Sequence, residues 1–291
     1  MTQSNRKFES PSRCFQHLRR PSRCVQHPRR PGRRHRRLRS ERKRMWPILG
    51  AWVSVKVISS APPEEVDSAI DEAMNVARRL QLEFNFHDAK SSLSRFNSWA
   101  RSEDDHPFEM SKELREVLQL ALILTLATGG AFSAFHNGDV DLGGIAKGYI
   151  VDQMVECLQQ SLPEASGVVN AGGDLRRFGS ITETVHLRLG TAERPLTREM
   201  TFPLSAIATS SRAGQDLHVQ SSTRYKREFA SHLSRESTVV AAAESCMLAD
   251  AATKVGLFGD IESQRKFCQD FEVCLFAFDS DGNLSHVFDF L

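Results

Sequence analysis

Several common sequence signals are absent from this chain, and each absence narrows the possible functions. No run of about 18 or more apolar residues occurs, so we expect no membrane span. No G-x-G-x-x-G motif follows a predicted strand and no G-x-x-x-x-G-K-[ST] motif occurs, so neither a Rossmann fingerprint nor a Walker loop is present. No apolar segment with a small-residue cleavage site follows the N-terminal arginines, and we therefore expect a cytoplasmic protein.

Cysteine is sparse and scattered along the chain. The six residues lack the close spacing of metal ligands and stand at Cys14, Cys24, Cys157, Cys246, Cys268 and Cys274. Two of them, Cys157 and Cys246, fall inside predicted helices. We expect free thiols in a reducing compartment.

Charge is strongly one-sided at the N-terminus, where acidic residues are scarce. Residues 1–44 contain 16 Lys and Arg against Glu9 and Glu41, whereas the rest of the chain has a net charge of −12. The same segment holds the repeat PSRCFQHLRR–PSRCVQHPRR, with too few apolar residues for a core. We predict a disordered basic tail over 1–44 and a folded domain over 45–291. Two interpretations of the tail stay open. It could bind polyanions, or it could be an extension without a function, for example one that precedes a true start codon at Met45.

Hydrophobic periodicity predicts a single α+β domain in which mixed β-sheets pack against helices. Helices are expected at 61–86, from 112 to the Gly129-Gly130 stop, at 146–161 and at 245–257, with a loop at 87–97. Ser111 should cap the second helix, whose long apolar face should be deeply buried. Strands are expected at 51–58, from 166 into a glycine turn at 172–173, at 184–190, 200–210 and 237–243, and in a hairpin over 273–290.

The stretch DLGGIAKGYIVD, residues 141–152, carries the clearest chemical pattern. Glycines before a helix start let a ligand approach the backbone, and the free N–H groups there suit phosphate. Lys147 could reach a pyrophosphate oxygen, and Asp141 could accept from a ligand N–H or hydroxyl. Taken alone, however, a Gly-Gly turn is more often only a turn.

Three further stretches offer polar groups of the right kind. VNAGGDLR (169–176) is a second glycine turn, and AIATSSRAG places small hydroxyl residues after a strand. CMLADAATKVG puts Asp250 and Thr253 on one helical face, and a hard cation such as Mg²⁺ prefers oxygen ligands of this kind. Read alone, an aspartate such as Asp250 is more often a solvated helix residue.

Together and in this order, these stretches resemble the ApbE-like FAD:protein FMN transferases. That family carries DLGGIAKGYAVD, from which this chain departs only at Ile150, and VNAGGDLR is intact. Its CLLADALTKV resembles CMLADAATKV, its GGAFD resembles GGAFS at 129–133, and its MSFHDPDSDVSRLN resembles FNFHDAKSSLSRFN at 84–97. The resemblance covers residues 46–291 and implies a single ApbE-like, T-fold-related domain.

The resemblance also implies a reaction and a set of site residues. Such enzymes bind FAD and Mg²⁺, cleave the pyrophosphate, release AMP and place FMN on a Ser or Thr hydroxyl of an acceptor protein. The matching positions imply a catalytic role for His218 and a metal site at Gly144, Asp250 and Thr253. The implied FAD-binding positions are Leu49, His87, Ala131, Phe132, Ser133, Asp141, Lys147 and Val219.

Two departures from the family pattern bear on activity, one at 133–140 and one after His218, and the spacing of the implied metal ligands differs from that of many relatives without changing their assignment. Ser133 replaces the acidic residue of AFD, and residues 134–140 form a connection that we expect to be too short for a strand pair and its turn. His218 is kept, but Gln220-Ser221 replace the family's Asp-Pro. In the predicted helix at 245–257, which carries the implied metal ligands, Thr253 lies three residues after Asp250 and Lys254 lies four residues after it.

Three functional hypotheses follow. The first is an FMN transferase acting on a protein, and the second is an FAD-binding protein of the same fold with only FAD pyrophosphatase activity or none. The third is a nucleic-acid-binding protein that uses the basic tail. The acidic body would repel a polyanion, so we do not expect nucleic acid as a partner.

Overall fold

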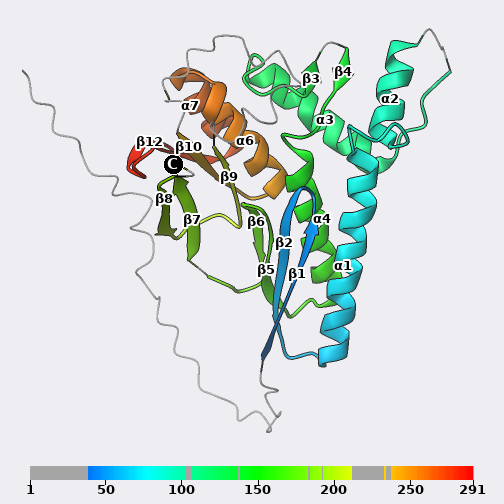
Figure 1. Ribbon diagram of the computed structural model, residues 1–291, viewed down its shortest axis with the longest axis vertical. Coiled ribbons are helices and arrows are strands. Elements are labelled where there is room, and N and C mark those ends of the chain that lie inside the picture. Colours follow the sequence, from blue (N-terminus) through cyan, green and yellow to red (C-terminus); the bar gives the residue numbers. More distant parts are fainter. Residues whose placement is uncertain are drawn as a thin grey trace, which may run out of the picture. The chain divides into compact units, whose positions relative to one another are not determined.

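The computed structural model describes residues 39–102, 106–136, 138–182, 184–191, 193–211, 233 and 237–290 (Figure 1). The predicted site residues His218 and Val219 lie outside this part of the chain, as do Cys14, Cys24 and nearly all of the predicted tail. Of the other cysteines, Cys157, Cys246 and Cys268 carry free thiols, as expected.

The domain begins with a β-hairpin. Strand β1 (Ser40–Ile48) pairs with β2 (Ala51–Ser59) across a turn in which Leu49 and Gly50 have φ angles of 60° and 67°. The strand at 51–58 is therefore confirmed, but the predicted boundary at residue 44 is wrong. The basic residues 42–44 belong to β1, where two arginines form ion pairs with acidic residues of the first helix.

All eight strands of the main sheet run antiparallel to their neighbours, in the order β1-β2-β5-β6-β9-β10-β11-β12. The central strands are β5 (Ser166–Ala171), β6 (Asp174–Phe178), β9 (Ala206–Ser211) and β10 (Thr238–Ala243). The last two are β11 (Cys274–Phe278) and β12 (Leu284–Phe288), which form the predicted C-terminal hairpin.

Three long helices were predicted close to their observed bounds. They are α1 (Pro63–Phe84), α4 (Ala146–Ser161) and α6 (Cys246–Phe258). Helices α1 and α4 lie side by side, and α6 packs on β9, β10 and α4 (Figure 1). The helices cover one face of the sheet, where Val53, Val55 and Val57 are fully buried.

Helix α3 (Lys112–Ala127) begins at the predicted cap, where the Ser111 hydroxyl accepts a hydrogen bond from the Leu114 N–H at 3.1 Å. Only one side of α3 is buried, so the prediction of a deeply buried apolar face is wrong in part. Leu122, Ile123 and Leu126 are 49%, 53% and 72% exposed.

Helix α2 (Ser92–Arg101) occupies much of the segment predicted as a loop. The Ser91 hydroxyl caps it by accepting from the Ser94 N–H at 3.0 Å. Within α2, the Asn97 amide donates to the Val140 carbonyl at 2.8 Å and accepts from the Val140 N–H at 2.9 Å.

The segment 134–140 also corrects a prediction, because it holds a small strand pair. Strands β3 (Phe135–His136) and β4 (Asp139–Val140) have two residues each, so the short connection suffices. The Asp141 N–H closes the loop by donating to the Ala134 carbonyl at 2.8 Å.

The other face of the sheet carries a separate β-hairpin. It consists of β7 (Val185–Gly190), which was predicted, and β8 (Pro195–Met200), which was not. The predicted strand at 200–210 is only β9. Leu187 and Leu189 pack with Ile207 in a second apolar core on this face.

One further helix was missed, α7 (Ile261–Phe271), which packs near β11 and β12. No helix in the part of the chain that the structure describes is long and apolar enough to cross a membrane.

Candidate functional site

The stretch 141–152 forms a tight bend followed by α4. The Asp141 carboxylate accepts from the Gly143 N–H at 2.8 Å, and the Leu142 carbonyl accepts from the N–H groups of Ile145 and Ala146 at 3.0 and 2.8 Å. Asp141 therefore shapes the bend with one oxygen. The remaining lone pairs of the carboxylate are available for the ligand contact implied by the family resemblance.

The first turns of α4 and α6 meet at Gly148. A β-carbon on Gly148 would lie 2.3 Å from the Cys246 carbonyl oxygen, so only glycine allows this approach. The Gly148 N–H also donates to Asp250 Oδ2 at 3.2 Å. Asp250, predicted as a metal ligand, is thus 1% exposed and places a carboxylate at the start of α4, where the helix dipole favours negative charge.

The last residue of the stretch, Asp152, is a structural capping group. Its Oδ1 accepts from the Cys246 N–H and from Arg176 Nη1, both at 2.8 Å, and its Oδ2 accepts from the Met247 N–H at 2.9 Å. Burial raises the pKa of Asp152, while Arg176 and the two N–H groups oppose that rise. The second aspartate of the motif therefore fixes the start of α6.

Lys254 lies at the centre of a group of oxygen atoms contributed by β9 and α6. Its Nζ is 2.5 Å from Asp250 Oδ1, and 3.2 Å from both Ser210 Oγ and Thr253 Oγ1. The Thr253 hydroxyl donates to the Asp250 carbonyl at 2.7 Å. The 2.8 Å contact between the two hydroxyls is therefore a hydrogen bond from Ser210 to Thr253.

Lys147 forms the second cationic position. Its Nζ lies 2.9 Å from Asp174 Oδ2, at the start of β6. Burial lowers the pKa of Lys147, but the carboxylates of Asp174 and Asp250 outweigh it and the pKa is raised. Burial, together with the charge of Asp250, raises the pKa of Asp174 to about 6. The group thus combines two carboxylates with two ammonium groups, which are Asp174, Asp250, Lys147 and Lys254.

The segment 131–133, predicted to line the FAD site, lies beside the bend. Ring atoms of Phe132 and the Cε of Lys254 would each be 3.5 Å from a β-carbon on Gly144. Ala131 and Phe132 are buried, and the Ser133 hydroxyl accepts from the Phe135 N–H at 3.2 Å. The structure therefore brings together Gly144, this segment and α6.

The other predicted FAD residues lie in different places. Leu49 stands in the β1–β2 turn, and its N–H donates to Gln81 of α1 at 2.9 Å. His87 is exposed after α1, and its described contacts are local: its ring meets Phe86 edge-on, and its N–H donates to Asn85 at 3.0 Å. These contacts do not join His87 to the bend.

The glycine turn of VNAGGDLR connects the adjacent strands β5 and β6 of the main sheet. Gly172 and Gly173 have φ angles of 66° and 109°, and the Gly173 N–H donates to Asn170 at 3.1 Å. A β-carbon on Gly172 would lie 2.6 Å from that of Ala51, so the β1–β2 and β5–β6 turns are neighbours.

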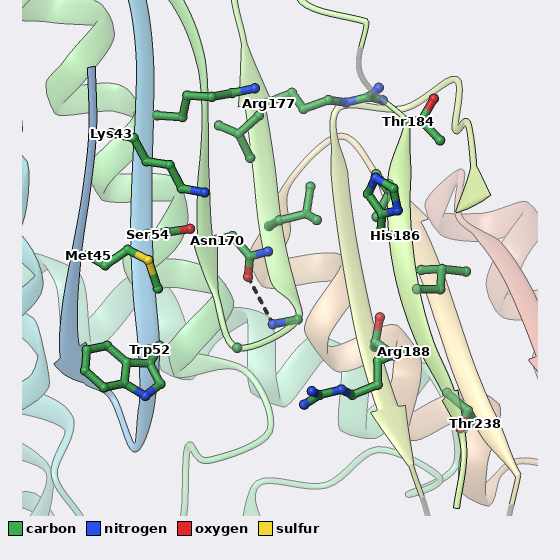
Figure 2. A pocket seen from close by; sticks show the side chains of 18 of the residues that line it. Lys43, Met45, Trp52, Ser54, Asn170, Arg177, Thr184, His186, Arg188 and Thr238 are labelled. Atoms are coloured by element: carbon green, nitrogen blue, oxygen red, sulfur yellow. Dashed lines mark hydrogen bonds between the residues drawn. The ribbon is translucent and has the colours of Figure 1, made fainter. Parts of the chain in front are cut away.

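A cavity of about 830 Å³ opens on the face of the sheet away from α6. Figure 2 shows Lys43, Ser54 and Asn170 on one side of it and His186 and Arg188 on the other. In the described part of the chain its lining includes basic side chains and no acidic one. In β2, the lining residues Ser54 and Lys56 alternate with the buried Val53, Val55 and Val57.

A divalent cation does not fit this site while Lys254 keeps its place. The oxygens implied for the metal are of the right kind, but an ammonium already contacts Asp250 Oδ1 and Thr253 Oγ1. The other Asp250 oxygen accepts from Gly148. Among the described residues, no group of three or more His, Cys, Asp or Glu side chains could hold a metal ion.

Three contributors to the site were missed from the sequence. Asn97 holds the strand before the bend, Asp174 pairs with Lys147, and Ser210 contacts Lys254. All three belong to stretches that resemble the family, so the motifs pointed to them. Their contacts, however, join segments far apart in the chain.

The antiparallel sheet, with α4 and α6 meeting at a glycine bend, is the fold of the flavin transferase ApbE structures. The Vibrio cholerae flavin transferase ApbE aligns with a TM-score of 0.63 at 17% identity, covering 87% of this chain and 98% of that one. The Thermotoga maritima ApbE protein aligns with a TM-score of 0.63 at 20% identity, covering 85% and 97%. The apo form of the Pseudomonas stutzeri flavinyl transferase ApbE gives 0.62 at 15% identity, covering 86% and 94%.

Residues 135–276 match the model of the ApbE family, a range that includes the bend, α4, the glycine turn and α6. A comparison with curated proteins gives no match. The solved structures show that the chain has the fold of the ApbE proteins, which confirms the α+β fold expected from the sequence, and residues 135–276 are similar to the ApbE family.

Proposed function

We propose that this ApbE-like chain is a flavin transferase, which takes FMN from FAD and attaches it to a Ser or Thr hydroxyl of an acceptor protein. The observation that carries the proposal is the placement of Lys147 and the Gly143-Gly144 bend at the start of α4, within the family match. A helix start with a nearby ammonium suits a diphosphate. Flavin transfer from FAD begins with cleavage of that group.

The chemical step is a phosphoryl transfer. The acceptor oxygen forms a bond to the phosphorus of the FMN half, and the bond from that phosphorus to the bridging oxygen breaks. AMP leaves with the bridging oxygen, and a base takes the hydroxyl proton. Catalysis of this kind consists mainly of positioning and charge stabilisation, which the start of α4 and Lys147 supply here. We assign the base to His218 on the family resemblance.

Magnesium at Gly144, Asp250 and Thr253 stays a prediction from the resemblance. The step described here does not pass through it, because Lys254 occupies the oxygens that the ion would need. We also propose Leu49, Ala131, Phe132, Ser133 and Asp141 as positions near FAD, and His87 and Val219 on the resemblance alone.

Hydrolysis of FAD to FMN and AMP is the second candidate function. It is favoured by Gln220-Ser221, which replace the Asp-Pro expected after His218. Without a group that positions the acceptor hydroxyl, water would attack the phosphorus in place of that hydroxyl.

The test is to incubate the purified protein with FAD, with and without a Ser/Thr-containing acceptor protein. Transfer predicts AMP release that rises with acceptor, together with a flavin-fluorescent acceptor band on a denaturing gel. AMP release without that band would establish hydrolysis instead. If AMP were absent under all conditions, the chain would bind FAD without turnover or not bind it at all.

A further inference from the structure

We propose that the ammonium of Lys254 is the resident cation at the site where the family resemblance places Mg²⁺, so that this chain needs no divalent ion there. The role of this ammonium beneath a flavin diphosphate rests on the proposed function. The claim that this ammonium occupies the cation position does not rest on the proposed function, because it follows from the contacts of Lys254 alone.

The contacts of Lys254 match the bonding capacity of an ammonium group. A lysine has three N–H donors and no acceptor, and three oxygens surround this one, those of Ser210, Asp250 and Thr253. All three belong to β9 or α6, whose packing holds them together. The nitrogen therefore lies where a hard cation would meet the same oxygens.

The side chain of Lys254 is held in this position along its length. Lys254 is 9% exposed, and it follows Asp250 by one helical turn, so the two meet as an i, i+4 pair on α6. Its methylene groups pass Gly144, where a β-carbon would lie 3.5 Å from Cε and 3.7 Å from Cγ. The bend thus packs against the stem of the lysine.

Charge balance disfavours an additional divalent ion. Asp174 and Asp250 are 2% and 1% exposed, and two ammonium groups, those of Lys147 and Lys254, already compensate their charge. An added Mg²⁺ would leave two uncompensated positive charges in a buried region, at contact distance from Lys254. Metal binding would therefore require the ammonium to leave.

The first experiment measures binding of Mn²⁺ alone, by titration calorimetry and by the loss of the free-ion EPR signal. Because Lys254→Met removes the competing charge and keeps the stem, we expect it to bind Mn²⁺ at least about tenfold more tightly than the wild type, which corresponds to about 1.4 kcal/mol. Equal affinities for the two proteins would overturn the proposal. So would a folded Lys254→Met variant that binds no Mn²⁺, since the oxygens would then not form a cation site.

Two further variants serve as controls. Asp250→Asn/Lys254→Met removes both charges and should lose the gained Mn²⁺ affinity. Lys266→Met removes a surface lysine that pairs with Asp270, also at i, i+4, and should leave Mn²⁺ binding at the wild-type level. Circular dichroism melts establish that each variant is folded.

The second experiment needs no variant and remains decisive if Lys254→Met does not fold. FAD binding to the wild type is measured by flavin fluorescence, in EDTA and in Mg²⁺. We expect affinities that agree within about twofold, whereas binding more than about tenfold tighter in Mg²⁺ would refute a resident ammonium. If FAD bound in neither buffer, the proposed function would fail, and the Mn²⁺ titration would still decide the identity of the cation.

Discussion

Gly148 of α4 lies directly against Cys246, the first residue of α6, with space for a hydrogen atom but not for a methyl group. This contact brings the two helix starts together. Because Gly148 also donates to Asp250, the same contact sets the position of the carboxylate that holds Lys254. The glycine thus acts on the site through packing.

Replacing Gly148 with alanine should therefore destabilise the protein. The new β-carbon would meet backbone atoms of α6, which move only together with the helix, and overpacking of this kind costs about 1–3 kcal/mol. Urea denaturation measures the change in the free energy of unfolding. Gly144→Ala is the matched control, since its β-carbon would make ordinary contacts at 3.5 Å. If the two variants were equally stable, the close approach of α4 and α6 would be wrong.

Replacing Asp152 with alanine should cost about 3 kcal/mol or more, because it removes a buried charge partner of Arg176 and two helix-capping acceptors. The free energy of unfolding at neutral pH is the measurement. Asp270→Ala, which breaks only an exposed ion pair with Lys266, should change it by less than about 1 kcal/mol. A small effect at Asp152 would mean that α6 does not depend on this cap.

The titration of Asp174 should lower the free energy of unfolding as the pH rises from about 4 to about 6. Its pKa in the folded protein is about 6, raised by burial and by Asp250, whereas an unfolded aspartate titrates near pH 4. Between these values the folded state holds more protons than the unfolded state, so raising the pH favours unfolding. The neighbouring Lys147, whose pKa is raised by Asp174 and Asp250, remains charged across this range.

The measurement compares the wild type with Asp174→Asn in urea denaturation over this pH range. The wild type should lose stability relative to the variant as the pH increases, because the amide does not titrate. A difference that stays constant with pH, or changes in the opposite direction, would contradict the raised pKa.

Long, strongly periodic helices were predictable from the sequence alone. In α1, Val66, Ile70, Met74, Ala77 and Leu80 recur at helical spacing, and all five are buried. Shorter and more polar elements were not. Helix α2 has only Leu93 and Asn97 fully buried, β8 is exposed along almost its whole length, and α7 buries the polar Gln264, which donates to the carbonyls of Gly256 and Gly259.

For the site, local chemistry was predictable and long-range pairing was not. The bend, the helix start and the cap at Ser111 each depend on neighbouring residues in the chain. The contact between Lys254 and Ser210 spans 44 residues and depends on the packing of α6 on β9. A motif places Lys254 after Thr253, but only the fold shows that its ammonium lies among the oxygens assigned to a metal.

The most direct test of the account is a comparison of FAD and riboflavin binding by the wild type and Lys147→Gln, measured by flavin fluorescence. Riboflavin lacks the diphosphate, so the variant should bind it like the wild type while losing at least about tenfold in FAD affinity. Lys147→Gln/Asp174→Asn keeps the charge balanced and should show the same selective loss. Equal FAD affinity in the wild type and both folded variants would contradict a diphosphate held at the start of α4.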